Sequence, residues 1–403
     1  MNPFKKTILL LGTALLLCTI NLGNALAHSG EADLTTRART ALVEAQKQME
    51  LKNPAQAQAV LQEFLRHHSK EDHHFVEFTL AGLLYTENRL KKACTHYKKT
   101  VELCPDYGPG WQNLGKICFD LKRFHEAATA METSYKVCKK KNPIFLFHAA
   151  VAHISAKAPK KALEHMLFLT SGRAGTPKTN WVKVLTSLAI ELKRPKKALA
   201  TVERLLKDPI PDPMLWRLAT NLYLSMNNYS KSAETLAVYG MVHPLSTQEE
   251  TLLADLYNRI GIPAKAADHY QQVLKRKPSQ RIYERMVSAR LEACDKDKAL
   301  AAADKGVAAY PGSKVLWKLK GWIYYEYDQF DPAVKAFSRA MELDKNDKKA
   351  CFMKGLCASR AGAFETARQA LERASTFPEY KNQALSLIRE MEQRQMEQRA
   401  KKS

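Results

Sequence analysis

The sequence predicts an all-α protein made of stacked helical hairpins, and two observations carry this prediction. The first is a pattern that occurs twice between residues 314 and 378 at a fixed period of 34 residues, which is typical of a repeat array. The second is the spacing within each copy, where apolar residues lie three and four positions apart, as on one face of a helix. The matching positions are Trp317, Gly321, Tyr324, Ala333, Phe337 and Ala340, then Cys351, Gly355, Ala358, Ala367, Leu371 and Ala374.

A small residue early in the second helix of each hairpin extends the array toward the N-terminus. It recurs every 33 to 36 residues and predicts ten hairpins, with the differences in length assigned to the turns. Prolines near the ends of several hairpins stop the second helix, because proline cannot continue it. The ten small residues are Ala57, Ala93, Ala127, Ala162, Ala198, Ser232, Ala266, Ala299, Ala333 and Ala367.

The third hairpin carries the most specific form of the pattern, with Trp111, Leu114 and Gly115 in the first helix and Ala127 in the second. This order of residues resembles the tetratricopeptide repeat (TPR). The resemblance implies a TPR α-solenoid, a right-handed superhelix of about ten helix-turn-helix repeats with a C-terminal capping helix. In the first, fourth, fifth and eighth hairpins another residue replaces the glycine of the pattern: Ala45, Ala150, Leu185 and Val287.

The first residues predict export. Lys5 and Lys6 precede an apolar run at 7–20 and an Ala-Leu-Ala site at 25–27, which together indicate a signal peptide over 1–27. An uncleaved membrane anchor is the alternative. We therefore expect the chain to be secreted across the inner membrane, into a bacterial periplasm.

The rest of the chain divides into three parts. Residues 28–36 form a polar N-terminal segment, residues 37–378 form the array, and residues 379–403 form a capping helix with a basic tail. A repeat array needs a polar outer cap, which this last helix provides. A partner-binding coiled segment is the other interpretation of that helix.

The positive charge is concentrated in one part of the array. The formal net charge is +22, and residues 89–207 alone hold 24 Lys and Arg against 8 Asp and Glu. Such a block indicates an anionic neighbour or a solvated face. Because export excludes most nucleic acid, we expect no nucleic-acid partner, and the remaining candidates are an anionic envelope polymer, a membrane surface or an acidic protein.

The cysteines do not predict a disulfide framework. Seven follow the signal peptide, an odd number with no C-x-x-C pair, so they are expected to be small buried residues. One disulfide within 94–138 stays open as an alternative. The seven are Cys94, Cys104, Cys118, Cys138, Cys294, Cys351 and Cys357.

No motif for catalysis or for a cofactor is present, so we expect neither an enzyme nor a bound cofactor. The weak candidates for a metal site are His67, His68, His73 and His74, which lie beside carboxylates between the first two hairpins. Their spacing fits no closed site, and a solvated loop is the preferred interpretation.

The TPR resemblance implies a concave groove lined by defined positions of each first helix. In the second to fourth hairpins these positions form an apolar strip that suits an amphipathic helix or an extended peptide. Some of these side chains could instead pack between repeats. The predicted groove residues are Phe75, Phe78, Tyr85, Lys116, Phe119, Phe147 and Val151.

A second set of positions resembles the two-sided clamp with which some TPR domains hold a C-terminal carboxylate. Arginine meets a carboxylate with two parallel hydrogen bonds, which suits that task. Ordinary exposed charges are the alternative. The clamp positions are Arg217, Asn221, Arg281 and Arg285, and Trp322 and Tyr325 extend the same face.

The predicted function is an exported protein–protein interaction scaffold that binds a peptide or helix in its groove. The chain is similar to exported bacterial TPR proteins that accompany envelope complexes such as TonB-type systems, which implies a role beside such a complex. The alternative is binding of an anionic envelope polymer or membrane surface through the basic repeats two to five. The sequence does not specify an oligomeric state.

Overall fold

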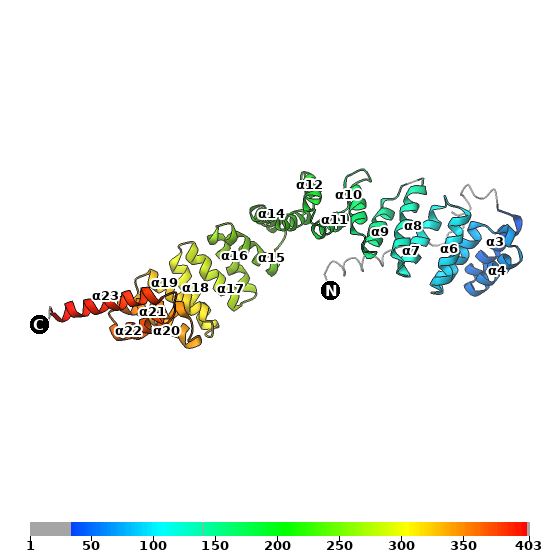
Figure 1. The fold of residues 1–403 in the computed structure, drawn as a ribbon. Helices are drawn as coiled ribbons and strands as arrows, with labels where there is room; N and C mark the ends of the chain where they lie inside the picture. Colours follow the sequence, from blue (N-terminus) through cyan, green and yellow to red (C-terminus); the bar gives the residue numbers. More distant parts are fainter. Residues whose placement is uncertain (1–33, 140, 401–403) are drawn as a thin grey trace. The chain divides into compact units, whose positions relative to one another are not determined.

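The computed structural model describes residues 34–139 and 141–400, and their regular structure is helical throughout (Figure 1). The predicted signal peptide lies outside the described residues. The chain divides into two compact units, Met1–Ser225 and Met226–Ser403, which are described separately as unit 1 and unit 2. Among the described helices, none is both long and apolar enough to cross a membrane.

Unit 1 consists of five helical hairpins followed by a single helix. Its elements are α3 (Thr36–Glu50), α4 (Pro54–His67), the 3-10 helix η2 (Ser69–Glu71), α5 (His74–Thr86), α6 (Leu90–Leu103), α7 (Gly108–Asp120), α8 (Phe124–Val137), α9 (Pro143–Ser155), α10 (Pro159–Thr170), α11 (Thr179–Glu191), α12 (Pro195–Leu205) and α13 (Met214–Ser225).

Unit 2 begins with a single helix, continues with four hairpins and ends with a long helix. Its elements are α14 (Tyr229–Val242), α15 (Thr247–Arg259), α16 (Pro263–Arg276), α17 (Gln280–Glu292), α18 (Lys296–Ala309), α19 (Lys314–Glu326), α20 (Phe330–Leu343), α21 (Lys348–Arg360), α22 (Phe364–Ser375) and α23 (Lys381–Ala400). The sixth hairpin of the sequence pattern thus contributes α13 to unit 1 and α14 to unit 2, where the sequence predicts one continuous array.

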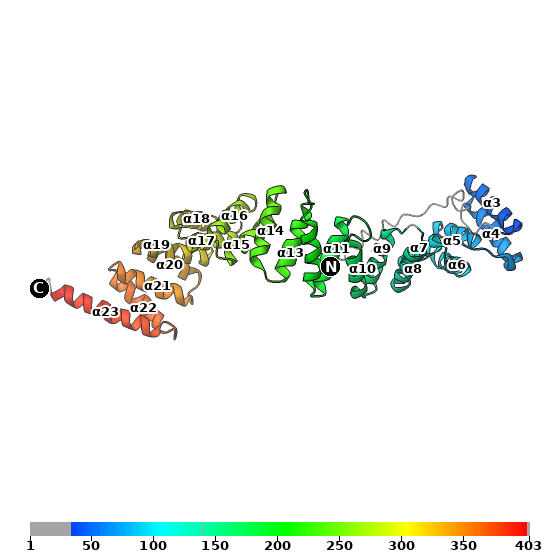
Figure 2. The same cartoon turned by 90° about the horizontal axis from the view of Figure 1, so that it is seen from above.

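The repeat pattern correctly predicts the all-α hairpin fold. Each helix packs against the next along the chain within its unit, as Figures 1 and 2 show from two sides. All ten small residues of the pattern are fully buried, because the two helices of a hairpin approach most closely there. The four residues that replace the glycine are also fully buried, so the departures do not open the helix pairs.

The turn between the two helices of each hairpin has the same backbone feature. One residue in each turn has a positive φ, and in eight of the ten turns it is not a glycine. In the third hairpin the N–H of Arg123 then donates to the carbonyl of Cys118 at 2.7 Å, which closes the end of α7. The ten residues are Lys52, Asn88, Lys122, Lys157, Lys193, Asn227, Gly261, Cys294, Asp328 and Gly362.

The last helix covers the end of the array, as the capping prediction requires. Ala384 and Met391 of α23 are buried against the tenth hairpin, and Arg368 of α22 donates to Glu392 at 2.9 Å. Leu385, on the flank of the same helix, stays exposed.

Glycine in the first helix leaves room for a large side chain of the second. A Cβ placed at Gly355 would lie 2.7 Å from Cγ of Leu371 and 3.2 Å from its backbone nitrogen, and Leu371 is fully buried. We therefore expect Gly355→Ala to lower the free energy of unfolding by about 1–2 kcal/mol, because overpacking outweighs the gain in helix propensity. Urea unfolding followed by circular dichroism measures the change.

Gly312→Ala is the control, since a Cβ at Gly312 meets no heavy atom within 4 Å. Its effect should stay within about 0.5 kcal/mol. A Gly355→Ala variant as stable as the parent chain would show that the approach of α21 and α22 is not limiting.

Candidate functional site

Four predicted groove residues lie in the hydrophobic core instead, which corrects that part of the prediction. Phe75, Phe78, Phe147 and Val151 are all less than 9% exposed. The rings of Phe75 and Phe78 meet the edge of Tyr107 at 5.5 and 5.3 Å between centroids. These side chains therefore hold neighbouring hairpins together and present little surface to a partner.

Three other predicted groove residues, Tyr85, Lys116 and Phe119, are partly exposed on α5 and α7. Nζ of Lys116 lies 4.7 Å from the ring centre of Tyr85, and the Tyr85 hydroxyl donates to Asp120 Oδ2 at 2.9 Å. Phe119 is half-buried, with its ring 5.2 Å from that of Phe124. We call Tyr85, Lys116, Phe119 and Asp120 the α5–α7 patch.

The electrostatics of the patch keep its hydroxyl neutral. Burial and the neighbouring Asp120 carboxylate raise the pKa of Tyr85 to about 12, so the phenol remains a hydrogen-bond donor. Burial also lowers the pKa of Lys116, although Asp120 opposes this shift. The patch thus offers half-buried rings with one charge of each sign beside them.

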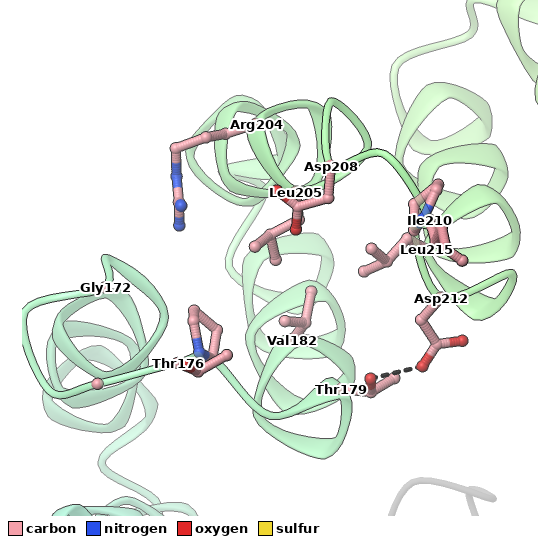
Figure 3. A pocket seen from close by; sticks show the side chains of 13 residues that line it. Gly172, Thr176, Thr179, Val182, Arg204, Leu205, Asp208, Ile210, Asp212 and Leu215 are labelled. Carbon is pink, nitrogen blue, oxygen red and sulfur yellow. Dashed lines mark hydrogen bonds between the residues drawn. The ribbon is translucent and has the colours of Figure 1, made fainter.

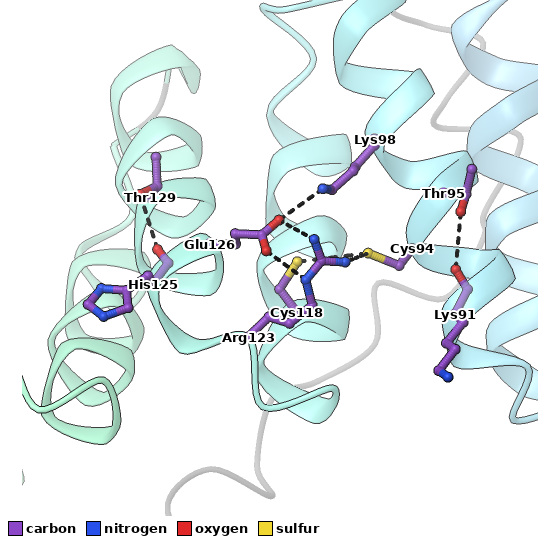
Figure 4. A network of polar contacts seen from close by, with 9 residues as sticks. All are labelled: Lys91, Cys94, Thr95, Lys98, Cys118, Arg123, His125, Glu126 and Thr129. Atoms are coloured by element: carbon purple, nitrogen blue, oxygen red, sulfur yellow. Dashed lines mark hydrogen bonds and ion pairs between the residues drawn. The ribbon is translucent and has the colours of Figure 1, made fainter.

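A polar network next to the patch connects the second hairpin to the third (Figure 4). Arg123 donates to both oxygens of Glu126 at 2.6 and 2.7 Å, and Lys98 Nζ lies 2.9 Å from Glu126 Oε2. Arg123 Nη1 is 3.6 Å from Sγ of Cys94, which lies 3.9 Å from Sγ of Cys118. A hydrogen bond from Cys118 lowers the pKa of Cys94 to about 6, and Arg123 and Lys98 act in the same direction against burial.

All seven cysteines of the described residues are free thiols. Cys94, Cys118, Cys351 and Cys357 are buried, as the packing interpretation predicts, whereas Cys294 is exposed in a turn. Burial raises the pKa of Cys357 to about 12.

The clamp positions are divided between the two units. Arg217 and Asn221 are exposed on α13 of unit 1. In unit 2, Arg281 is exposed on α17, and Nη1 of Arg285 donates to Asp255 at 2.6 and 2.8 Å. The clamp requires residues of both units together, so it stays a prediction.

The two aromatic residues that extend the clamp lie together on α19. The ring centroids of Trp322 and Tyr325 are 5.7 Å apart, and Nζ of Lys349 is 5.0 Å from the Trp322 ring. Both rings are half-buried. The ninth hairpin therefore presents an aromatic pair beside a lysine of the tenth hairpin, so that rings and a cation lie together as they do in the α5–α7 patch.

The four-histidine segment is not a uniformly solvated loop. His67 is exposed and His68 lies 3.7 Å from Glu71, but His73 accepts the N–H of Phe75 and caps α5. His74 is buried, and burial lowers its pKa to about 4. Two of the four histidines, His73 and His74, therefore belong to the N-terminal end of α5.

One set of possible metal ligands escaped the sequence interpretation. Among the described residues, Glu132, His153 and His165 bring their donor atoms within 4.8 Å of one another. They come from α8, α9 and α10, and no short motif contains them. Only the packing of two hairpins brings them together.

The sequence interpretation also missed an open pocket of about 550 Å³ in unit 1 (Figure 3). Val182, Leu205 and Leu215 supply apolar walls, and Asp212 accepts the Thr179 hydroxyl at 2.6 Å. Two connections longer than the usual turns, 171–178 and 206–213, form its rim. The glycines and prolines of these two connections were the feature of the sequence that could have indicated them.

Comparison with known proteins identifies the repeat. Residues 109–141, which contain the third hairpin, match the family model described as tetratricopeptide repeat. No curated protein shows significant sequence similarity to the chain.

Two solved structures can be compared with the chain, and the first of them shows a related fold. Naa15/Naa10 bound to HypK-THB is 15% identical, with a TM-score of 0.52 over 89% of this chain and 66% of that chain. MamA 41-end from Desulfovibrio magneticus RS-1 is 18% identical, with a TM-score of 0.35 over 44% of this chain and 96% of that chain. The chain thus contains a tetratricopeptide repeat at residues 109–141 and has the α-solenoid fold of proteins built from such hairpins.

Proposed function

We propose that the chain is an exported protein–protein interaction scaffold that binds a peptide or helix at the α5–α7 patch. The observation that carries the proposal is that half-buried rings occupy one position of the repeat. Tyr85, Phe119 and Tyr325 each precede the small residue of their hairpin by eight positions. The repeat thus leaves this position partly exposed, while Phe78, seven residues before Tyr85, is covered.

Half-buried aromatic rings suit partner binding because a partner can bury the rest of their surface at little cost in side-chain entropy. Lys116 and Asp120 would orient the bound segment, since each charge retains capacity for another hydrogen bond. The solved structure of this fold that contains Naa15, Naa10 and HypK-THB is a protein complex, which supports a scaffold role. The predicted signal peptide supports a partner in the cell envelope.

Removing both rings tests the patch. We expect Tyr85→Ala with Phe119→Ala to reduce capture of the partner at least tenfold, because a few aromatic anchors carry most of the energy of an interface. The full-length chain is immobilised and exposed to envelope extract, and the bound proteins are quantified after washing at high salt. Thermal unfolding is recorded for each variant.

Tyr327→Ala is a matched control, because Tyr327 also donates to an aspartate, Asp297, and lies under a lysine, Lys296, at 5.6 Å. It should leave capture unchanged. Equal capture by the patch variant and the parent chain would contradict the proposal. A collapse of thermal stability would instead assign the two rings to packing.

A second candidate function, binding of an anionic envelope polymer or membrane surface, is favoured by one edge of unit 1. The turns and second-helix starts of the fourth and fifth hairpins place seven exposed cations on this edge, which we call the lysine edge. Within the described residues none of the seven forms an ion pair with a carboxylate. They are Lys157, Lys160, Lys161, Lys193, Arg194, Lys196 and Lys197.

The position of these lysines costs stability. α10 and α12 have no acidic residue in the first turn, where the helix dipole favours one, and carry two lysines there instead. Each cation at a helix N-terminus is unfavourable by roughly 0.3–1 kcal/mol. An anionic surface would compensate this repulsion. The lysine edge is therefore unfavourable in the free chain and favourable in a chain that is bound to such a surface.

Neutralising two of these lysines should separate binding from stability. We expect Lys160→Gln with Lys161→Gln to weaken sedimentation with anionic lipid vesicles several-fold, while the unfolding temperature stays equal or rises. Binding of the parent chain should fall steeply as salt is added.

Lys275→Gln with Lys277→Gln is the control, since these exposed lysines lie at the C-terminal end of α16, where cations are favourable. This pair should change vesicle binding little. Vesicle binding that ignores both salt and the Lys160 and Lys161 changes would exclude the lysine edge.

A further inference from the structure

Three side chains of unit 1 converge between the third and fourth hairpins. Nε2 of His153 lies 2.6 Å from Oε1 of Glu132, and Nε2 of His165 lies 2.7 Å from the same oxygen. The two imidazole rings are stacked with centroids 5.6 Å apart. The His153 side chain is 4% exposed, whereas Glu132 and His165 are about one-quarter exposed and face a route to solvent.

This cluster differs from the histidine–glutamate pairs that the repeat forms elsewhere. In the second and seventh hairpins, a histidine three residues after the small residue meets a buried glutamate of its own first helix: His96 with Glu77, and His269 with Glu250. The corresponding histidine of the fourth hairpin is His165, but Leu146 occupies the glutamate position. His165 instead meets a carboxylate of the preceding hairpin, together with a second histidine.

One carboxylate oxygen here lies within hydrogen-bond distance of two imidazoles. In each of the two simple pairs, the glutamate meets one histidine. Burial acts to raise the pKa of Glu132, but the hydrogen bonds from His153 and His165 outweigh it and hold the pKa below its usual value. Nδ1 of His153 is buried and has no hydrogen-bond partner among the described residues. Two imidazoles and one carboxylate are a ligand set typical of zinc sites that keep one open position.

We propose that Glu132, His153 and His165 bind a divalent transition-metal ion of the zinc class, which would tie the third hairpin to the fourth. Metal–ligand distances of about 2.0–2.2 Å require the donor atoms to separate to roughly 3.3 Å, so the glutamate must retreat by less than about 1 Å. The partial exposure of Glu132 and His165 permits this shift and leaves a fourth position for water.

Metal binding would displace the Nε2 protons. The metal takes the Nε2 lone pair of each imidazole, so the Nε2 proton of a neutral ring moves to Nδ1, and that of an imidazolium leaves to solvent. The buried Nδ1 of His153 then carries a hydrogen without an acceptor among the described residues. Since an outer-shell partner typically contributes about 10–100-fold in affinity, the site should bind zinc more weakly than a complete structural site.

Zinc titration of the metal-free full-length chain tests the proposal, with heat release as the readout. We expect one zinc per chain at this site, lost with a more than tenfold fall in affinity in Glu132→Gln and in His165→Gln. Zinc should also raise the unfolding temperature of the parent chain, because it binds only the folded site, and should do so less in either variant.

His269→Gln is the matched control, since it removes the equivalent histidine of a simple pair in the seventh hairpin, and it should keep zinc binding intact. Zinc binding that survives both Glu132→Gln and His165→Gln, or that is absent in the parent chain, would overturn the proposal. If one of the two variants fails to fold, the other decides the outcome. His67→Gln with His68→Gln removes competing histidines, and the site should persist in that background.

Discussion

The close approach of two helices at one small residue in each hairpin is the constraint on which the rest of the structure depends. The ten residues that fulfil it, from Ala57 to Ala367, are fully buried. A larger side chain there would push the helix axes apart and leave the large side chains of the opposite helix without contacts. The constraint fixes the rotation of both helices about their axes. It thereby decides which positions are covered and which, such as those of Tyr85 and Phe119, reach solvent.

Because this constraint is periodic, the sequence could predict the all-α fold, the number of hairpins and most of the core. It could not predict how completely one helix is covered. On α5 every residue from His74 to Leu84 is buried, so Phe75 and Phe78 fill the space between hairpins although their positions suggest a groove. A pattern of positions assumes that all hairpins have equivalent neighbours. The second hairpin, which contacts both α3 and α4, and the fourth hairpin, where Phe147 and Val151 are buried too, are covered more completely than such a pattern assumes.

Interactions that break the period were the least predictable. Glu132, His153 and His165 belong to different helices, and their meeting depends on the stacking of two hairpins. One signal was available in Leu146, which stands where Glu77 and Glu250 stand in their own hairpins and so leaves His165 without the usual partner. The long connections that form the pocket beside α11 likewise depart from the repeat. In a repeat protein, these departures are the positions where function can be added without disturbing the shared packing.

Within unit 1, the three proposed sites occupy different parts of the hairpin and therefore do not compete. The α5–α7 patch uses first helices of the second and third hairpins, and the lysine edge uses turns of the fourth and fifth. The ligand set of Glu132 lies between the third hairpin and the fourth, at the junction of these two regions. An ion there would restrict motion between the hairpins on either side, because it would add bonds across an interface otherwise held by side-chain packing. Metal binding would then couple the orientation of the patch to that of the lysine edge, so that a partner and an anionic surface could be held in a fixed relation.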